Sequence, residues 1–130
     1  MKYLLSALFV MFFMGLATVA SAQAENDQAK SSKYETIELK VKGVCGMCKS
    51  RIETAVYDLK GVKTASWDLE TDVLTAVIHP KKVTRQEIAQ KLAERGHDNE
   101  LVKADTTAYQ ELPGCCKYND GVKKHGGGGH

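Results

Sequence analysis

The chain lacks a marked excess of charge of either sign. Its 130 residues carry 18 Lys and Arg against 16 Asp and Glu, which gives a formal net charge of +2 at pH 7. A nearly neutral surface provides no electrostatic reason to bind nucleic acid or an anionic membrane. The length suffices for one domain of ordinary size.

The chain also lacks an apolar run of spanning length. The run at residues 4–19 is shorter than the roughly 20 apolar residues that a membrane-spanning helix needs. A short basic start precedes this run, and Ala-Ser-Ala follows it at residues 20–22. This pattern is typical of a secretory signal peptide, so we expect residues 1–22 to be removed and the protein to be periplasmic or otherwise extracytoplasmic.

Cysteine is scarce, and its spacing does not suit a disulfide framework. The four cysteines are Cys45, Cys48, Cys115 and Cys116. An even number in an exported chain usually indicates disulfides. Here, however, each pair is too close in sequence to close a long loop within itself. The pairs therefore point to metal binding or to thiol chemistry.

Strand and helix signals alternate through the first part of the chain after a polar lead-in at residues 23–33. Apolar residues at every second position predict a strand over residues 34–41. Apolar residues three and four apart then predict an amphipathic helix that ends at Gly61, followed by a strand over 62–69. The residues expected on the buried faces of the two strands are Ile37, Leu39, Val41, Ala65, Trp67 and Leu69.

Residues 71–102 again show strand and helix signals, but they begin with a turn. A turn at residues 71–72 leads into a strand over 73–78 that is apolar on both faces. A capping box at Thr84 opens a second helix, which ends at Gly96, and residues 98–102 are expected to form a fourth strand. For the strand over 73–78, the face chosen as buried consists of Leu74, Ala76 and Ile78.

The resulting order is strand–helix–strand–strand–helix–strand over residues 34–103. Two short helices cover only one face of a four-stranded sheet, so we expect an α+β, ferredoxin-like two-layer sandwich with an antiparallel sheet. Residues 104–130 carry turn signals and end in a Gly-rich stretch. We expect them to be a flexible C-terminal extension.

The chemistry of the sequence is concentrated at Cys45 and Cys48. The pair lies where the first strand gives way to the first helix, so the unpaired N–H groups and the dipole of the helix start favour thiolate over thiol. Thiolate sulfur prefers soft ions such as Cu(I), Zn(II) or Hg(II) over Mg²⁺ or Ca²⁺. Two protein ligands leave the ion accessible to a further thiolate from a partner.

The Cys pair is accompanied by further motifs at the expected places. These are Leu-Lys-Gly-Val at 59–62, Val-Ile-His-Pro at 77–80 and Arg-Gly-His at 95–97. With them, residues 34–103 resemble the heavy-metal-associated domain family. That family includes copper chaperones, the N-terminal modules of metal-exporting P-type ATPases and the periplasmic mercury-binding protein.

The resemblance implies a binding protein and not an enzyme. One soft ion, Cu(I) first and Hg(II) or Zn(II) as alternatives, would be held by Cys45 and Cys48. It would pass to a metal-transporting membrane ATPase or another acceptor protein. The protein would be a monomer or a metal-bridged dimer, without a nucleic acid or a small-molecule substrate.

The sequence departs from the family pattern at two positions. Gly43 stands where a Met usually braces the metal loop, so we expect a looser loop. His97 stands where a Tyr or Lys is common, and it is a candidate third ligand whose protonation would make binding pH-dependent. Cys115 and Cys116 are further candidate ligands, which could form a second soft-metal site or fold back to complete the first, and the C-terminal His125 and His130 are weaker candidates.

A thiol–disulfide oxidoreductase that uses Cys45 as the attacking thiolate is the alternative from another class. The thioredoxin type has an aromatic residue before the first cysteine, where this chain has Val44. It also has a loop proline near the pair, whereas Pro80 and Pro113 lie at a strand end and in the tail. The predicted order of elements differs from that fold as well.

Overall fold

The computed structural model describes residues 32–126. The predicted signal peptide, nearly all of the lead-in and His130 lie outside these residues. The elements within them are β1 (Glu35–Lys40), α1 (Gly46–Tyr57), β2 (Val62–Trp67), β3 (Val73–Ile78), α2 (Arg85–Glu94), α3 (Thr106–Gln110) and the short 3-10 helix η1 (Gly114–Cys116).

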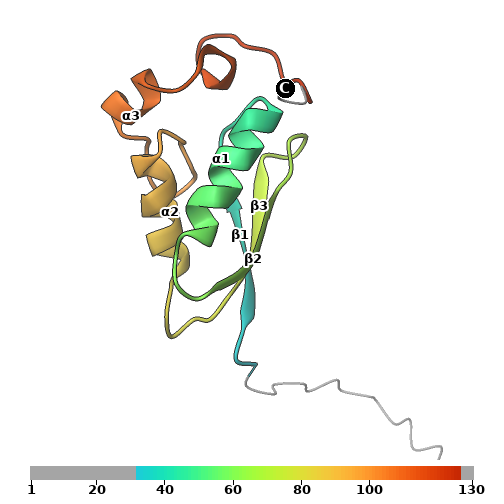
Figure 1. Cartoon of the computed structure of the whole chain (residues 1–130), viewed down its shortest axis with the longest axis vertical. Coiled ribbons are helices and arrows are strands. Elements are labelled where there is room, and N and C mark those ends of the chain that lie inside the picture. The colour runs from blue at the N-terminus through green and yellow to red at the C-terminus, as the bar shows by residue number, and fades with distance from the viewer. Residues whose placement is uncertain (1–31, 127–130) are drawn as a thin grey trace, which may run out of the picture. The chain divides into compact units, whose positions relative to one another are not determined.

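The strands form an antiparallel sheet in the order β1-β3-β2, and α1 and α2 pack side by side on it (Figure 1). α1 contacts β2 and α2 contacts β1, so the core lies between one layer of helices and the sheet. The predicted capping box at Thr84 is present. The predicted buried face of β3 is confirmed, since its three members are fully buried: Leu74, Ala76 and Ile78.

The predicted fourth strand over residues 98–102 is wrong for the described part of the chain. A single antiparallel bridge, between Val41 and Asn99, marks the place beside β1 where that strand would lie. The Asn99 side chain accepts hydrogen bonds from the N–H groups of Leu101 and Val102, at 3.1 and 2.9 Å. These bonds bend the chain into a turn, because a short polar side chain competes with the sheet for local N–H groups.

The expectation of a flexible extension is also corrected as far as residue 126. Residues 104–126, called here the C-terminal segment, contain α3 and η1 and pack against the domain. Leu112 and Cys116 belong to the same buried cluster as the sheet residues. Figure 1 shows the segment passing the start of α1, the end that carries the Cys pair. Burial of these apolar side chains holds the segment in place.

Trp67 fills the space beside Gly43, the position at which a looser metal loop was expected; the looseness itself stays a prediction. A Cβ atom at Gly43 would lie 2.8 Å from Cη2 of Trp67 and 3.0 Å from Cβ of Cys48. The indole Nε1 of Trp67 donates a hydrogen bond of 2.9 Å to the carbonyl oxygen of Val41. The buried Trp67 indole of β2 thus packs against the metal loop and supports it.

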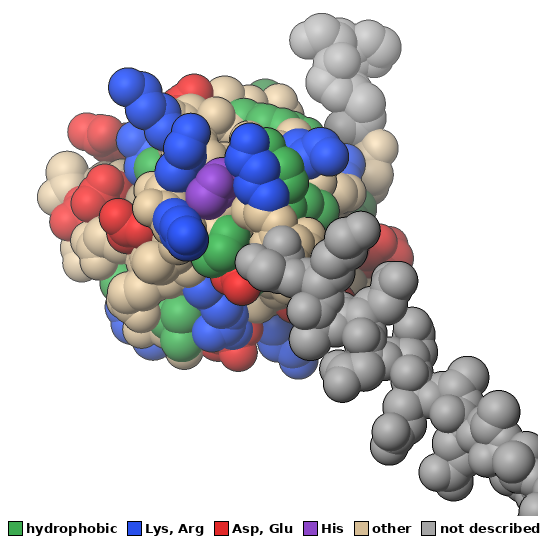
Figure 2. Space-filling view, turned by 90° about the horizontal axis from the view of Figure 1, so that it is seen from below, with side chains coloured by type: hydrophobic (Ala, Val, Ile, Leu, Met, Phe, Trp, Pro, Cys, Tyr) green, Lys and Arg blue, Asp and Glu red, His purple; other side chains and the backbone are tan. Residues whose placement is uncertain are grey.

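The opposite end of the domain is basic. Figure 2 views this end and shows Lys and Arg side chains around a histidine. Here the Lys33 and Lys63 ammonium groups lie 5.6 and 5.1 Å from the Tyr34 ring centroid. Among residues 32–126, no helix is both long enough and apolar enough to cross a bilayer.

The packing of Trp67 against the metal loop leads to a prediction about Gly43→Ala. The added methyl group must displace Trp67, so the variant should lose about 1–3 kcal/mol of unfolding free energy, as overpacked cores do. Urea unfolding of the reduced, metal-free protein measures this loss. Gly114→Ala is the matched control, because its Cβ meets nothing within 4 Å. Equal stability of the two variants would contradict the role given to Trp67.

Candidate metal site

Cys45 and Cys48 are positioned by the start of α1. Cys45 is the N-cap residue, in extended conformation, and its Sγ accepts a hydrogen bond of 3.3 Å from the N–H of Cys48. An N-cap acceptor satisfies one of the N–H groups that a helix start leaves unpaired. The preceding loop is held by a 2.8 Å bond from the N–H of Lys42 to the carbonyl oxygen of Asp98. The helix cap therefore fixes the direction of the Cys45 thiol.

The structure brings all four predicted cysteines to one place as free thiols. Sγ of Cys45 lies 3.3 Å from Sγ of Cys48 and 3.5 Å from Sγ of Cys116. The sulfurs of Cys115 and Cys116 are 4.0 Å apart. The Sγ atoms of Cys45, Cys115 and Cys116 all lie within 4.8 Å of one another, close enough to share an ion. We call these four residues the thiol cluster; their binding of metal stays a prediction.

The thiols of the cluster differ in acidity. Burial acts to raise the pKa of Cys45, but hydrogen bonds from the Cys48 N–H and from neighbouring thiols hold it below its usual value. Burial raises the pKa of Cys48 and of Cys116, and the neighbouring cysteines raise that of Cys116 further. Cys45 therefore ionises before Cys48 and Cys116, and a cation is needed to stabilise further thiolates beside it.

The C-terminal segment covers the cluster, and its own Cys116 belongs to the buried core. Cys45 is 1% exposed, and Cys48 and Cys116 are fully buried. Two sulfurs lie at the rim: Cys115 is half-buried, and its Sγ is 3.9 Å from Sδ of Met47, which is 43% exposed. The adjacent cysteines of the tail were the sequence signal here, since they were expected either to form a second soft-metal site or to fold back and complete the first.

His97, the predicted third ligand, is fully buried. It is not in the group of close ligand atoms formed by Cys45, Cys115 and Cys116. Its Nδ1 donates to the carbonyl oxygen of Lys42 at 2.9 Å, which leaves Nε2 as a bare acceptor. Nε2 has no hydrogen-bond partner among residues 32–126. The ring stacks on Tyr118 at 6.0 Å. Whether Nε2 binds an ion stays a prediction.

His125 enters the site through its backbone. Its N–H donates to the carbonyl oxygen of Val44 at 2.9 Å, beside the bridge that pairs it with Cys45. Its side chain is exposed, and Nδ1 bonds the carbonyl oxygen of Lys123. The structure therefore places His125 as part of the cover.

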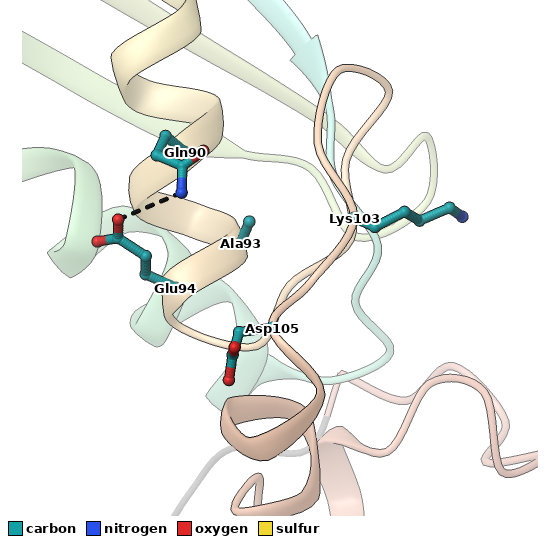
Figure 3. Close-up of a pocket in the computed structure, with 5 residues that line it drawn as sticks. All are labelled: Gln90, Ala93, Glu94, Lys103 and Asp105. Carbon is teal, nitrogen blue, oxygen red and sulfur yellow. Dashed lines mark hydrogen bonds between the residues drawn. The ribbon is translucent and has the colours of Figure 1, made fainter.

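A hollow beside α2 offers no comparable chemistry. Figure 3 shows its polar lining, where Nε2 of Gln90 donates to Oε1 of Glu94 at 3.3 Å. Neither a thiol nor an imidazole lines it; the lining residues are Gln90, Ala93, Glu94, Lys103 and Asp105. The thiol cluster is therefore the candidate functional site.

The fold and the cluster define a class: small α+β domains that present thiols at the start of their first helix. Residues 38–98 match the model of the heavy-metal-associated domain. This part of the chain is a heavy-metal-associated domain, as the motifs predicted. The match does not favour the oxidoreductase alternative.

Individual proteins are similar to parts of this chain. A zinc-transporting ATPase from Synechocystis sp. is 34% identical over 79 residues, which cover 60% of this chain and 11% of that protein. The Cu(I)-loaded N-terminal domain of a potential copper-translocating P-type ATPase from Bacillus subtilis is 22% identical, with a TM-score of 0.50, over 56% of this chain and 92% of that chain. The CopZ metallochaperone is 29% identical, with a TM-score of 0.49, over 50% of this chain and 98% of that chain. This chain thus spans about a tenth of its curated relative.

The burial of His97 leads to a prediction about pH. Burial lowers its pKa below the ordinary 6.5, and the Arg51 charge lowers it further, although the Lys42 carbonyl opposes this. The unfolded chain then binds a proton where the folded protein does not, so this stability is present above pH 6.5 and is lost as the pH falls below it.

Unfolding of the reduced, metal-free protein in urea between about pH 7 and about pH 5 measures the effect. The wild-type free energy of unfolding should fall more steeply on acidification than that of His97→Gln. Equal slopes would contradict the assignment of a neutral, buried imidazole.

Proposed function

We propose that this chain is an exported carrier of a soft metal ion, which Cys45 and Cys48 hold as thiolates. The observation that carries the proposal is the 3.3 Å separation of their sulfurs at the start of α1. Helix N–H groups and the helix dipole stabilise negative charge at this point. The family to which residues 38–98 belong is, by its description, associated with heavy metals.

Cu(I) is the ion we propose first. The donors of the thiol cluster are sulfur atoms, and soft thiolates select Cu(I) and other thiophilic ions. Low coordination numbers suit Cu(I), whereas structural Zn(II) sites use four ligands. Hg(II) and Zn(II) are the alternatives, and the name of the zinc-transporting relative keeps Zn(II) among them.

The ion leaves by exchange of thiolate ligands with an acceptor protein. A thiolate of the acceptor binds the ion while Cys45 and Cys48 release it one at a time, so no free ion is formed. The acceptor we propose is a metal-transporting membrane ATPase, a class that includes the zinc-transporting relative. The protein then binds and transfers without catalysis.

Export is the part of the proposal that rests on residues 1–22. Their basic start, apolar run and Ala-Ser-Ala end support cleavage after Ala22. An extracytoplasmic site suits a carrier that acts beside a membrane transporter.

Binding is tested with Cys45→Ser and Cys48→Ser. Serine keeps an oxygen acceptor at the N-cap, so α1 should still form. Each variant should lose Cu(I) affinity by at least about 100-fold, more than the loss of an outer-sphere partner costs. Competition of the reduced protein with a chromophoric Cu(I) chelator measures the affinity.

Ser50→Ala is the matched control, since Ser50 is exposed on the same helix two residues after Cys48. It should bind Cu(I) nearly as the wild type does. Unchanged binding in both serine variants, or catalysed reduction of insulin disulfides by the wild type, would overturn the proposal.

Cleavage is tested by the mass of the mature protein. Expression of the full chain in a Gram-negative bacterium should place it in the periplasmic fraction with Gln23 as its first residue. Mass spectrometry of the intact protein reads the terminus. A cytoplasmic protein that retains residues 1–22 would contradict export and leave the metal-binding proposal standing.

A further inference from the structure

The C-terminal segment contributes a thiol to the site that the first helix builds. We propose that Cys116 is the third ligand of the bound ion and that the C-terminal segment closes the site over it. This inference rests on the proposed function, since it concerns how the same ion is held. It replaces an open two-ligand site by a covered three-thiolate site.

Two sulfur–sulfur distances, both measured from Cys45, suit an ion shared by Cys45, Cys48 and Cys116. Sulfurs bound to an ion at about 2.3 Å lie ~3.8–4.0 Å from one another in tetrahedral or trigonal arrangement. Sγ of Cys116 lies 3.5 Å from Sγ of Cys45, and Sγ of Cys48 lies 3.3 Å from the same atom. Small outward shifts of a few tenths of an ångström would therefore admit the ion.

Contacts on both sides of Cys116 fix its position. Its N–H donates to the carbonyl oxygen of Pro113 at 2.8 Å within η1. Two residues later, the Tyr118 hydroxyl donates to the carbonyl oxygen of Gly96 at 2.8 Å and accepts from the N–H of Asp98 at 2.9 Å. These bonds tie η1 to the loop after α2, so Cys116 is anchored independently of the other thiols.

The end of the segment returns to the metal loop. The His125 N–H bonds the carbonyl oxygen of Val44, the residue before the first cysteine. Lys124 forms an ion pair of 3.0 Å with Asp72 in the turn between β2 and β3. The segment is thus attached before and after Cys116, and it excludes solvent from the buried thiols.

Cys115 has a different place, although it is the next residue along the chain. It is half-buried, and its sulfur faces Met47 at the rim. Its distance to Cys116, 4.0 Å, also leaves it near the ion. The two adjacent cysteines therefore form a matched pair for experiment, one buried beside Cys45 and one at the surface.

X-ray absorption of the Cu(I)-loaded monomer counts the sulfur ligands directly. The wild type should show three, Cys116→Ala should show two, and Cys115→Ala should still show three. Size-exclusion chromatography confirms that the loaded protein is monomeric. Release of Cu(I) to a chelator should be at least about tenfold faster in Cys116→Ala, because even an outer-sphere partner contributes that much.

The double variant Met47→Leu, Cys115→Ala covers the case in which Cys116→Ala does not fold. It leaves Cys45, Cys48 and Cys116 as the thiols of the chain. After removal of residues 1–22, which carry the other methionines, three sulfurs in this monomer can come from these residues alone, and two sulfurs would overturn the inference.

Two further outcomes would also overturn the inference: two sulfurs in the wild type, or three in folded Cys116→Ala. Both leave the proposed function standing, since Cys45 and Cys48 still bind the ion. A wild type that binds no Cu(I), Hg(II) or Zn(II) would instead overturn the proposed function, and this inference with it.

Discussion

The hydrogen bond from the Cys48 N–H to Sγ of Cys45 is the interaction on which the site depends. A helix start needs an acceptor at its N-cap, and here a thiol takes the place that Ser or Asp usually fills. The same bond lowers the pKa of Cys45 and fixes its sulfur 3.3 Å from that of Cys48. The bond that caps α1 is therefore the same bond that positions the Cys45 sulfur, and the Cys-x-x-Cys motif provides both.

Burial opposes the ionisation of the thiols, so it affects the pH at which the cluster loses its protons. Desolvation raises the pKa values of Cys48 and Cys116, so the metal-free cluster keeps its protons there. An ion must displace these protons, and binding therefore becomes more favourable as the pH rises. A cation of sufficient affinity for thiolate meets this cost, whereas Mg²⁺ or Ca²⁺ does not. Cover by the C-terminal segment thus adds selectivity as well as protection.

The sequence predicted the parts of the fold that depend on local pattern. Alternation located β3 with its buried face, and the capping box at Thr84 located α2. The sequence-based prediction missed interactions between segments that are distant along the chain. Trp67 beside Gly43 depends on the pairing of β2 with β3, and Asn99 forms a turn where a short fourth strand was expected. The position of Cys116 depends on Tyr118 reaching the loop after α2, which no local pattern encodes.

A covered site must open before its ion can be exchanged, and the attachments of the C-terminal segment differ in strength. The ion pair of Lys124 with Asp72 is partly exposed, and such pairs contribute about 0–1 kcal/mol. The Tyr118 hydroxyl, in contrast, makes two short bonds in a half-buried setting next to His97. We therefore expect local opening to begin at the C-terminal end, near residue 125, while the Tyr118 bonds still anchor Cys116. In the proposed carrier, an acceptor thiolate would then reach the ion before its last ligand is lost, which would keep the transfer free of a bare ion.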